Sequence, residues 1–135
     1  MISTRGRYAL RVMIDIAEQS NTGYIPLNDI ATRQAISEKY LESIVVLLTR
    51  GGLLEGVRGK GGGYKLTRTP DEYPLSSILR LTEGSLAPVA CLKEGATCER
   101  SPFCKTLPVW KGFYAVIDHY LSGVTLADLL NPTEK

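Results

Sequence analysis

Apolar residues recur at helical spacing in three segments of the first fifty residues, and this pattern predicts three helices. The first covers residues 5–19. Pro26 suits the first turn of a second, short helix. Ser37 is a favourable N-cap for the third helix, which Gly51 and Gly52 end. The side chains that we expect on the buried faces are Ala9, Val12, Met13, Ile16, Ala17, Leu27, Ile30, Ala31, Leu41, Ile44, Val45 and Leu48.

Two short extended segments, residues 53–57 and 64–67, follow the third helix. Four of the six residues between them are glycine, so this segment is the loop of a hairpin. Three helices followed by a hairpin are typical of a winged helix-turn-helix, in which the hairpin is called the wing. We therefore expect a mostly α fold with a small β-hairpin, and a DNA-binding domain over residues 1–69.

Residues 70–105 are predicted to hold a turn, a short helix over residues 75–81, and a long loop over residues 84–105. The loop has no periodicity and contains all three cysteines, and long loops without structure of their own are usually functional or disordered. We interpret residues 70–105 as a linker helix followed by a loop that binds a cofactor.

Residues 106–135 are predicted to form a long C-terminal dimerisation helix, over residues 108–121, and a tail. A helix so apolar around its circumference needs cover on several sides, which a second copy of the chain can supply. No apolar run is long enough to cross a bilayer and no signal peptide is evident, so we expect a cytoplasmic protein with no membrane partner. The apolar stripe consists of Trp110, Phe113, Tyr114, Ile117 and Leu121, widened by Val109, Val116 and Tyr120.

The net charge of +2 is unevenly distributed along the 135 residues. Residues 1–69 have ten Lys or Arg and six Asp or Glu, a net charge of +4, whereas residues 70–135 carry −2. This asymmetry favours contact between the first half and a polyanion. Double-stranded DNA is the partner that fits both this charge and the predicted fold.

The exposed face of the third helix and the wing provide the candidate DNA-binding residues. The helix offers hydrogen-bond donors, an acceptor and an amphipathic ring to base edges, and the glycine-rich wing can bring an arginine into the minor groove. Arg5, Arg7 and Arg33 are candidates for further phosphate contacts. A tight solvated turn in the wing, and a local pairing of Lys39 with Glu42, are the alternatives. The candidates are Ser37, Lys39, Tyr40, Glu42, Ser43, Arg50, Arg58 and Lys60.

Cys91, Cys98 and Cys104 lie within fourteen residues, and this odd number excludes a closed set of intrachain disulfides. Three thiolates are one too few for a four-cysteine zinc or iron–sulfur site. An iron–sulfur cluster with a further ligand, a zinc site and thiol redox sensing all remain open. An enzyme with a small-molecule substrate is not expected, because neither a Ser–His–Asp set nor an HExxH motif is present.

Four sequence segments resemble the Rrf2 family of bacterial regulators: residues 5–10 (RGRYAL), 37–42 (SEKYLE), 57–64 (VRGKGGGY) and 124–130 (VTLADLL). The resemblance implies a homodimer in which the long helix of each subunit crosses its partner. It also implies that the protein binds a pseudo-palindromic operator and thereby represses or activates transcription.

Family members with three clustered cysteines before the long helix are iron–sulfur regulators, and one group of them senses nitric oxide. The resemblance therefore implies a [2Fe-2S] or [4Fe-4S] cluster on the three cysteines, and we favour [2Fe-2S]. The presence or state of this cluster would alter DNA binding in response to iron–sulfur supply, oxidative stress or nitrosative stress. By the same resemblance, Tyr40, Glu42 and Ser43 would read bases and Arg58 would enter the minor groove.

The fourth ligand of such a cluster is unknown from the sequence. Leu107 stands where the iron–sulfur regulators have a histidine, and Tyr8 stands where the nitric-oxide sensors have an aspartate. We expect His119 to be solvated or packed rather than a ligand. A hydroxide or a small thiol would also serve. The candidate oxygen donors are Glu94, Glu99, and Asp15 or Glu42 of the other subunit.

Overall fold

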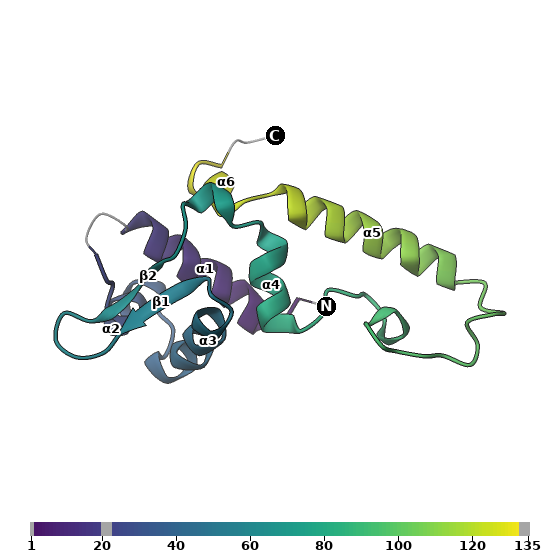
Figure 1. Cartoon of the computed structure of the whole chain (residues 1–135), viewed down its shortest axis with the longest axis horizontal. Coiled ribbons are helices and arrows are strands. Elements are labelled where there is room, and N and C mark those ends of the chain that lie inside the picture. Colours follow the sequence, from purple (N-terminus) through teal and green to yellow (C-terminus); the bar gives the residue numbers. More distant parts are fainter. Residues whose placement is uncertain (1, 20–22, 133–135) are drawn as a thin grey trace.

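The computed structural model describes residues 2–19 and 23–132, and it is mostly helical with one antiparallel hairpin (Figure 1). One helix extends from a compact body that the other helices and the hairpin form (Figure 1). The elements are α1 (Thr4–Glu18), α2 (Leu27–Gln34), α3 (Glu38–Arg50), β1 (Leu54–Val57), β2 (Gly63–Leu66), the 3-10 turn η2 (Pro70–Glu72), α4 (Leu75–Glu83), the 3-10 turn η3 (Ala90–Leu92), α5 (Leu107–Gly123) and α6 (Leu126–Leu130).

The three predicted N-terminal helices are confirmed, each within a residue or two of its expected bounds. Of the side chains expected to face inward, only Leu27 is partly buried, and the others form one hydrophobic core. The Ser37 hydroxyl caps α3 by accepting a hydrogen bond from the Tyr40 amide at 3.1 Å. The spacing of apolar residues therefore fixes which face of α3 points away from the core.

The wing, defined here as residues 54–66, is attached to the body through Ile25. The amide of each residue in the Ile25–Tyr64 pair donates to the carbonyl of the other at 2.8 Å. Gly63 has φ of +148°, and a Cβ atom there would lie 2.2 Å from the Ile25 carbonyl oxygen. A side chain at this position would push the wing away from the body, so the glycine is required by close approach.

Tyr73 joins the two ends of the wing, where the chain enters β1 and leaves β2. Its ring is fully buried, and its hydroxyl accepts from the amides of Thr67 at 2.8 Å and Arg68 at 2.9 Å. The same hydroxyl donates to the Leu53 carbonyl at 2.9 Å. One phenol thus satisfies three backbone groups that would otherwise lack partners at the edge of the core.

After α5 the chain returns to the body and forms the short helix α6, which periodicity did not predict. The amide of Leu126 donates to the Tyr73 carbonyl at 2.9 Å, and the amide of Leu75 donates to Val124 at 2.8 Å. Leu126 is fully buried and α6 packs against α1. The hydrophobic core thus includes side chains from both sides of the boundary at residue 69 that the order of helices and hairpin suggested.

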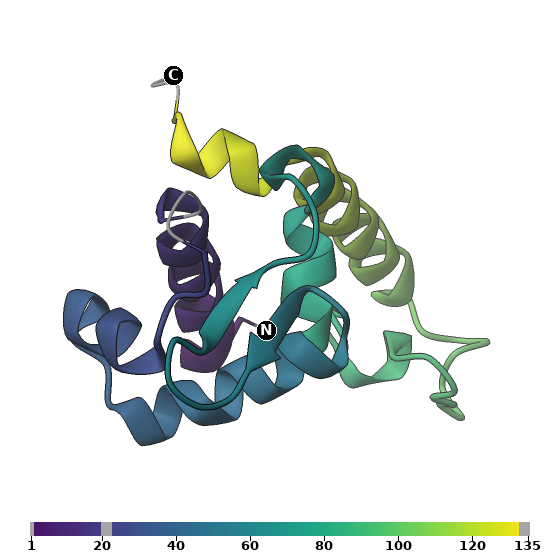
Figure 2. The same cartoon turned by 60° about the vertical axis from the view of Figure 1, so that its left-hand side comes forward.

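Helix α5 extends from the body, and the cysteine loop, defined here as residues 84–105, lies on the opposite side of the molecule from the wing (Figures 1 and 2). None of the residues of α5, all in the described part of the chain, is buried. It contacts α4 through an Arg80–Asp118 ion pair and a Ser122–Ser76 hydrogen bond of 3.1 Å. Within the described residues, no helix is both long and apolar enough to cross a membrane.

Candidate DNA-binding surface and cysteine loop

The face of α3 opposite the core carries the polar side chains that the sequence singled out. Lys39, Glu42, Ser43 and Arg50 are exposed, and Tyr40 is partly buried. The Ser43 hydroxyl donates to the Tyr40 carbonyl at 2.6 Å and keeps its lone pairs available to other donors. The arrangement offers a cation, a carboxylate, a hydroxyl and a ring on one helix face, which suits contact with base edges in a major groove.

A shallow hollow along this face also receives Arg5, from the first turn of α1. Arg5 lines the hollow together with Lys39, Glu42 and Arg50. The structure thus brings one of the expected phosphate-binding arginines next to the candidate base-reading residues. Arg7 is exposed on the same helix, and its guanidinium donates to the Thr4 hydroxyl at 3.4 Å.

A second groove separates α3 from the wing. Arg50 of α3 and Arg58 of the wing line it, together with the apolar side chains of Val46 and Val57. Lys60 is exposed nearer the tip of the wing. Two guanidinium groups and two exposed valine side chains thus lie at the junction between the helix and the wing, and the positive charge there suits contact with phosphate.

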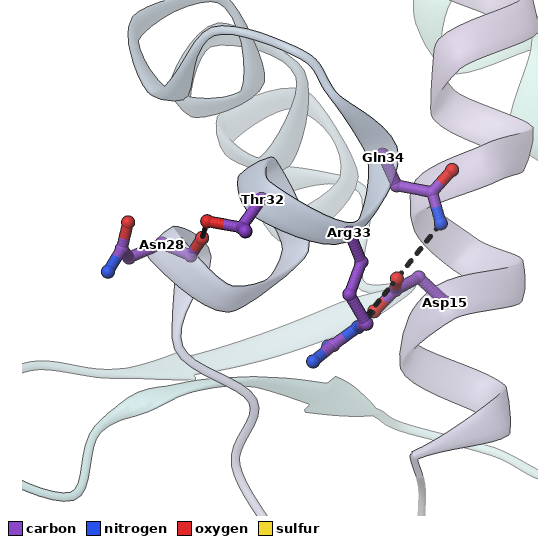
Figure 3. A network of polar contacts seen from close by, with 5 residues as sticks. All are labelled: Asp15, Asn28, Thr32, Arg33 and Gln34. Carbon is purple, nitrogen blue, oxygen red and sulfur yellow. Dashed lines mark hydrogen bonds and ion pairs between the residues drawn. The ribbon is translucent and has the colours of Figure 1, made fainter.

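Arg33, one of the candidates for a phosphate contact, forms an ion pair within the body. Its guanidinium donates to both carboxylate oxygens of Asp15, at distances of 2.7 and 3.0 Å, and Gln34 donates to the same carboxylate at 2.9 Å (Figure 3). The hydrogen bond with Asp15 raises the pKa of Arg33 against the opposing effect of burial. Asp15 is only 3% exposed. It therefore links α1 to α2 and is not accessible as a ligand for a cluster in another subunit.

The three cysteines lie in an exposed loop. Cys98 is exposed and Cys91 and Cys104 are partly buried. Every residue from 93 to 103 is exposed, and no group of three or more His, Cys, Asp or Glu in the described residues is close enough to hold a metal ion. The structure therefore does not bring the predicted ligands together.

Cys104 lies just before α5 and contacts Thr106, with 3.3 Å between the sulfur and the hydroxyl oxygen. The Thr106 hydroxyl, followed by the backbone amides of Thr106 and Leu107, lowers the pKa of the Cys104 thiol. A lowered pKa favours the thiolate, which is the form that binds soft metal centres. Three thiols in an exposed loop fit the donor chemistry of an iron–sulfur cluster, since the loop can fold around a cluster without disturbing the core.

The structure limits where a fourth ligand can come from. Leu107 is the first residue of α5, and its hydrocarbon side chain cannot ligate iron. His119 is exposed twelve residues further along the same helix, which places it about 18 Å from the start of α5. Glu94 and Glu99 are exposed within the cysteine loop. Of the ligands considered from the sequence, these two carboxylates are the donors within the same chain that the loop itself could bring to the thiols.

Two contacts of the candidate surface were missed by the sequence analysis. The ring of Tyr8 meets the ring of Tyr40 edge-on, and the guanidinium of Arg11 lies over Tyr8. Tyr8 and Tyr40 are thirty-two positions apart, so no local rule relates them. The signal that could have found them is the position of Tyr8 on the partly buried side of the first helix, next to the core position Ala9.

Comparison with known proteins resolves the family. The Rrf2 family profile, described as an iron-dependent transcriptional regulator, matches residues 2–132. The chain belongs to the Rrf2 family. This agrees with the predicted fold class and with the prediction that the chain is a DNA-binding transcriptional regulator and not an enzyme.

Relatives of this Rrf2 protein include the HTH-type transcriptional regulator IscR of Erwinia tasmaniensis. The two are 37% identical over 134 residues, which cover 98% of this chain and 80% of the relative. IscR of Aliivibrio salmonicida is 36% identical, with 98% of this chain and 79% of the relative covered. The resemblance to IscR-type regulators thus extends over nearly the whole chain.

Two solved structures are similar over almost the full length. CymR, the global cysteine regulator of B. subtilis, matches with a TM-score of 0.79 and 34% identity, covering 99% of this chain and 98% of CymR. IscR of T. potens matches with a TM-score of 0.77 and 34% identity, covering 99% and 88%. Both the cysteine regulator and the IscR protein therefore share the architecture described above.

Proposed function

We propose that this Rrf2 protein is a homodimeric, cytoplasmic transcriptional regulator whose binding to operator DNA depends on an iron–sulfur cluster. The observation that carries the proposal is the shared surface of α3 and the wing. There the exposed polar face of the helix and the groove with Arg50 and Arg58 are continuous through Val46 and Arg50, which line both hollows.

On this surface each candidate residue has a distinct role in DNA binding. Tyr40, Glu42 and Ser43 read base edges in the major groove, while Lys39 and Arg50 contact phosphates. Arg58 enters the minor groove beneath the wing, with Lys60 beside it on the backbone. Ser37 caps α3 through its oxygen, and its hydroxyl hydrogen remains available to a phosphate.

The dimer rests on the uncovered apolar side chains of α5. Phe113, Val116 and Tyr120 are 42, 67 and 66% exposed. A second copy of α5 would cover this stripe, and a two-fold dimer presents two copies of α3 to a pseudo-palindromic operator. Dimerisation thus accounts for the apolar side chains of α5 that α4 leaves exposed.

The cluster would be held by Cys91, Cys98 and Cys104, as [2Fe-2S] in preference to [4Fe-4S]. A bound cluster supplies iron that oxidants, nitric oxide or competition for cluster assembly can remove or modify. The chain contributes three thiolates from one exposed loop, and the lowered pKa of Cys104 keeps one of them ready to bind. We do not expect Leu107 or His119 of the same chain to be the fourth ligand. The iron without a fourth thiolate is therefore the site where oxidants or nitric oxide would react.

A second candidate function is that of a cysteine regulator like CymR, or a sensor that uses thiols or zinc without a cluster. The structural similarity supports it, because CymR matches this chain with a TM-score of 0.79 and 34% identity. The clustered cysteines favour the iron–sulfur function instead. A nitric-oxide sensor is a variant of the cluster function and differs only in the signal.

Anaerobic purification with iron, sulfide and zinc analysis on one sample tests the cofactor. We expect a coloured protein with equal iron and sulfide, and loss of both in the variant with Cys91, Cys98 and Cys104 all changed to Ser. Zinc without colour, or a colourless protein after attempted reconstitution, would reject the cluster in favour of the second candidate. Size-exclusion chromatography with light scattering on the same sample tests the dimer.

Selection of bound duplexes from a random pool tests the DNA-binding surface. We expect a pseudo-palindromic sequence to be enriched, with a binding constant that falls steeply with salt because phosphate contacts release counterions. Arg58→Ala should weaken binding by about 1–3 kcal/mol and relax A·T preference beneath the wing. Enrichment of no sequence would overturn the proposed function, and unchanged binding by Arg58→Ala would remove the wing from it.

A further inference from the structure

Tyr40 stands at the start of α3 with its ring supported from another helix. Its ring centroid is 5.8 Å from that of Tyr8 on α1, and the two planes make an angle of 61°. This is the edge-to-face arrangement that aromatic pairs favour. Both rings are partly buried, so each has one side on the body and one side toward solvent.

Tyr8 is itself held in place by Arg11, one turn along α1. The guanidinium carbon of Arg11 lies 5.1 Å from the centre of the Tyr8 ring. Arg11 Nε donates to Gln34 Oε1 at 3.0 Å, and another guanidinium nitrogen donates to the Gln34 carbonyl. Because a planar guanidinium is fixed by two such bonds, its position over the ring is defined.

Gln34 connects this stack to the buried ion pair. Its side-chain nitrogen donates to Asp15 at 2.9 Å, and Asp15 is held by Arg33 on α2 (Figure 3). A continuous set of polar and aromatic contacts therefore runs from the buried carboxylate, through Arg11 and Tyr8, to the ring of Tyr40. The set ends at Tyr40, one of the candidate DNA-binding residues of α3.

The stack restricts the conformations of Tyr40 before DNA arrives. An aromatic side chain at the first turn of a helix can otherwise occupy several rotamers, and a contact that reads a base needs one of them. A side chain that is ordered in advance loses less conformational entropy on binding. The benefit is confined to contacts made by Tyr40, so it changes base discrimination and not the general attraction to phosphate.

We propose that Tyr8 is a positioning residue that fixes Tyr40 for base recognition, and that Arg11 holds Tyr8 in turn. The proposal rests on the proposed function, because it takes Tyr40 to be a base-reading residue. Tyr8 has no hydrogen bond through its hydroxyl among the contacts of the described residues, so the ring alone carries the role. Phenylalanine at this position should therefore replace tyrosine.

The test uses the full-length protein and the duplex that the unaltered protein enriches from a random pool. Affinities for that duplex, its single-base variants and a scrambled duplex are measured by fluorescence anisotropy for Tyr8→Leu, Tyr8→Phe, Tyr40→Leu and the Tyr8→Leu/Tyr40→Leu double variant. Tyr8→Leu removes the aromatic contact that orders Tyr40. If the whole interaction free energy of such a contact is lost from binding, the affinity for the enriched duplex falls by about 2- to 12-fold. Affinity for the scrambled duplex should stay within about 2-fold in every variant.

The pattern of losses separates positioning from general destabilisation. Tyr8→Leu should lose discrimination at the same base pairs as Tyr40→Leu, and should cost no more than about 2-fold further when Tyr40 is already leucine. Tyr8→Phe should retain discrimination. Leu10→Ala is the matched control, because it truncates a partly buried side chain on the same helix that has no aromatic ring.

Three results would each overturn the inference while leaving DNA recognition intact. These are full discrimination by Tyr8→Leu, additive losses in the double variant, and equal losses of discrimination in Leu10→Ala. Failure of the unaltered protein to enrich any duplex would instead reject the proposed function. If all five variants are compared at temperatures well below their measured unfolding midpoints, loss of folded protein cannot imitate the expected pattern.

Discussion

The body of this Rrf2 protein and its α5 segment contain similar residues but place them in opposite environments. Val45 on α3 is fully buried, whereas Val116 on α5 is 67% exposed. Asp15 in the body is 3% exposed and accepts from two side chains, whereas Asp118 on α5 pairs with Arg80 at the surface. One chain thus completes the core of the body but leaves one side of α5 exposed.

This difference indicates how the two halves of the molecule depend on other components. The helix and the wing that carry the proposed DNA-binding residues pack within one chain, so their arrangement should survive without a partner or a cofactor. Residues 93–103 are all exposed and α5 contacts only one side of the body through α4, so we expect both segments to depend on the proposed dimer and cluster. The comparison can be tested with matched substitutions, in which the same chemical change is made in each half.

The largest difference is expected between Asp15→Ala and Asp118→Ala. Removing Asp15 leaves Arg33 and Gln34 without their shared acceptor, and breaking a buried pair is strongly destabilising. Because Arg33 is about one-third exposed and can reach water, we expect a loss of about 2–4 kcal/mol in the free energy of unfolding. Asp118→Ala breaks an exposed pair and should cost about 0.2–1 kcal/mol.

Urea denaturation of the metal-free proteins, at one fixed protein concentration, measures both changes in the free energy of unfolding. Equal losses would show that α5 is as firmly integrated as the body, and would contradict the comparison. Asp15→Asn sharpens the result, since it keeps an acceptor oxygen for one donor and should lie between the unaltered protein and Asp15→Ala.

A smaller difference is expected between Val45→Ala and Val116→Ala. Truncating the buried valine loses apolar burial and leaves a cavity, which should cost about 2 kcal/mol in the free energy of unfolding. Val116→Ala should leave the unfolding of the dissociated chain nearly unchanged and weaken self-association instead. Sedimentation equilibrium over a dilution series tests the second effect, and unchanged association would exclude Val116 from the interface.

The body could be predicted from the sequence because its helices follow simple periodic rules. The spacing of Leu41, Ile44 and Leu48 gave the buried face of α3, and hence its exposed polar face. Glycines gave the turn of the wing. The same periodicity could have predicted that Asp15 is buried, because it lies between Val12 and Ile16 on the buried side of α1. A buried carboxylate needs a partner, so an ion pair could have been expected there.

The remaining features depend on contacts that are distant in sequence or lie outside one chain. Helix α6 is too short for a periodic signal, and its position depends on pairing between Thr125 and Pro74. The edge contact between Tyr8 and Tyr40 arises only once α1 and α3 have packed. The spacing of the cysteines indicates a cofactor, but their geometry in an exposed loop does not follow from that spacing.

The smallest of the matched differences is expected between Tyr73→Phe and Tyr120→Phe. The Tyr73 hydroxyl serves two backbone amides and one carbonyl at the base of the wing, so its removal leaves buried groups without partners. We expect a loss of about 1–2 kcal/mol in the free energy of unfolding, because neighbouring Thr67 can take over part of the hydrogen bonding. Tyr120 is 66% exposed, and loss of its hydroxyl should have no measurable effect on unfolding.

Amide hydrogen exchange adds a local measurement to this last pair. In Tyr73→Phe the amides of Thr67 and Arg68 should exchange faster, since their acceptor is gone, while the Leu41–Leu48 part of α3 keeps its protection. Faster exchange throughout α3 would show that the wing and α3 unfold together. Protection confined to α3 would show instead that the base of the wing opens separately, so that the position of Arg58 can vary while the proposed base-reading face of α3 stays fixed.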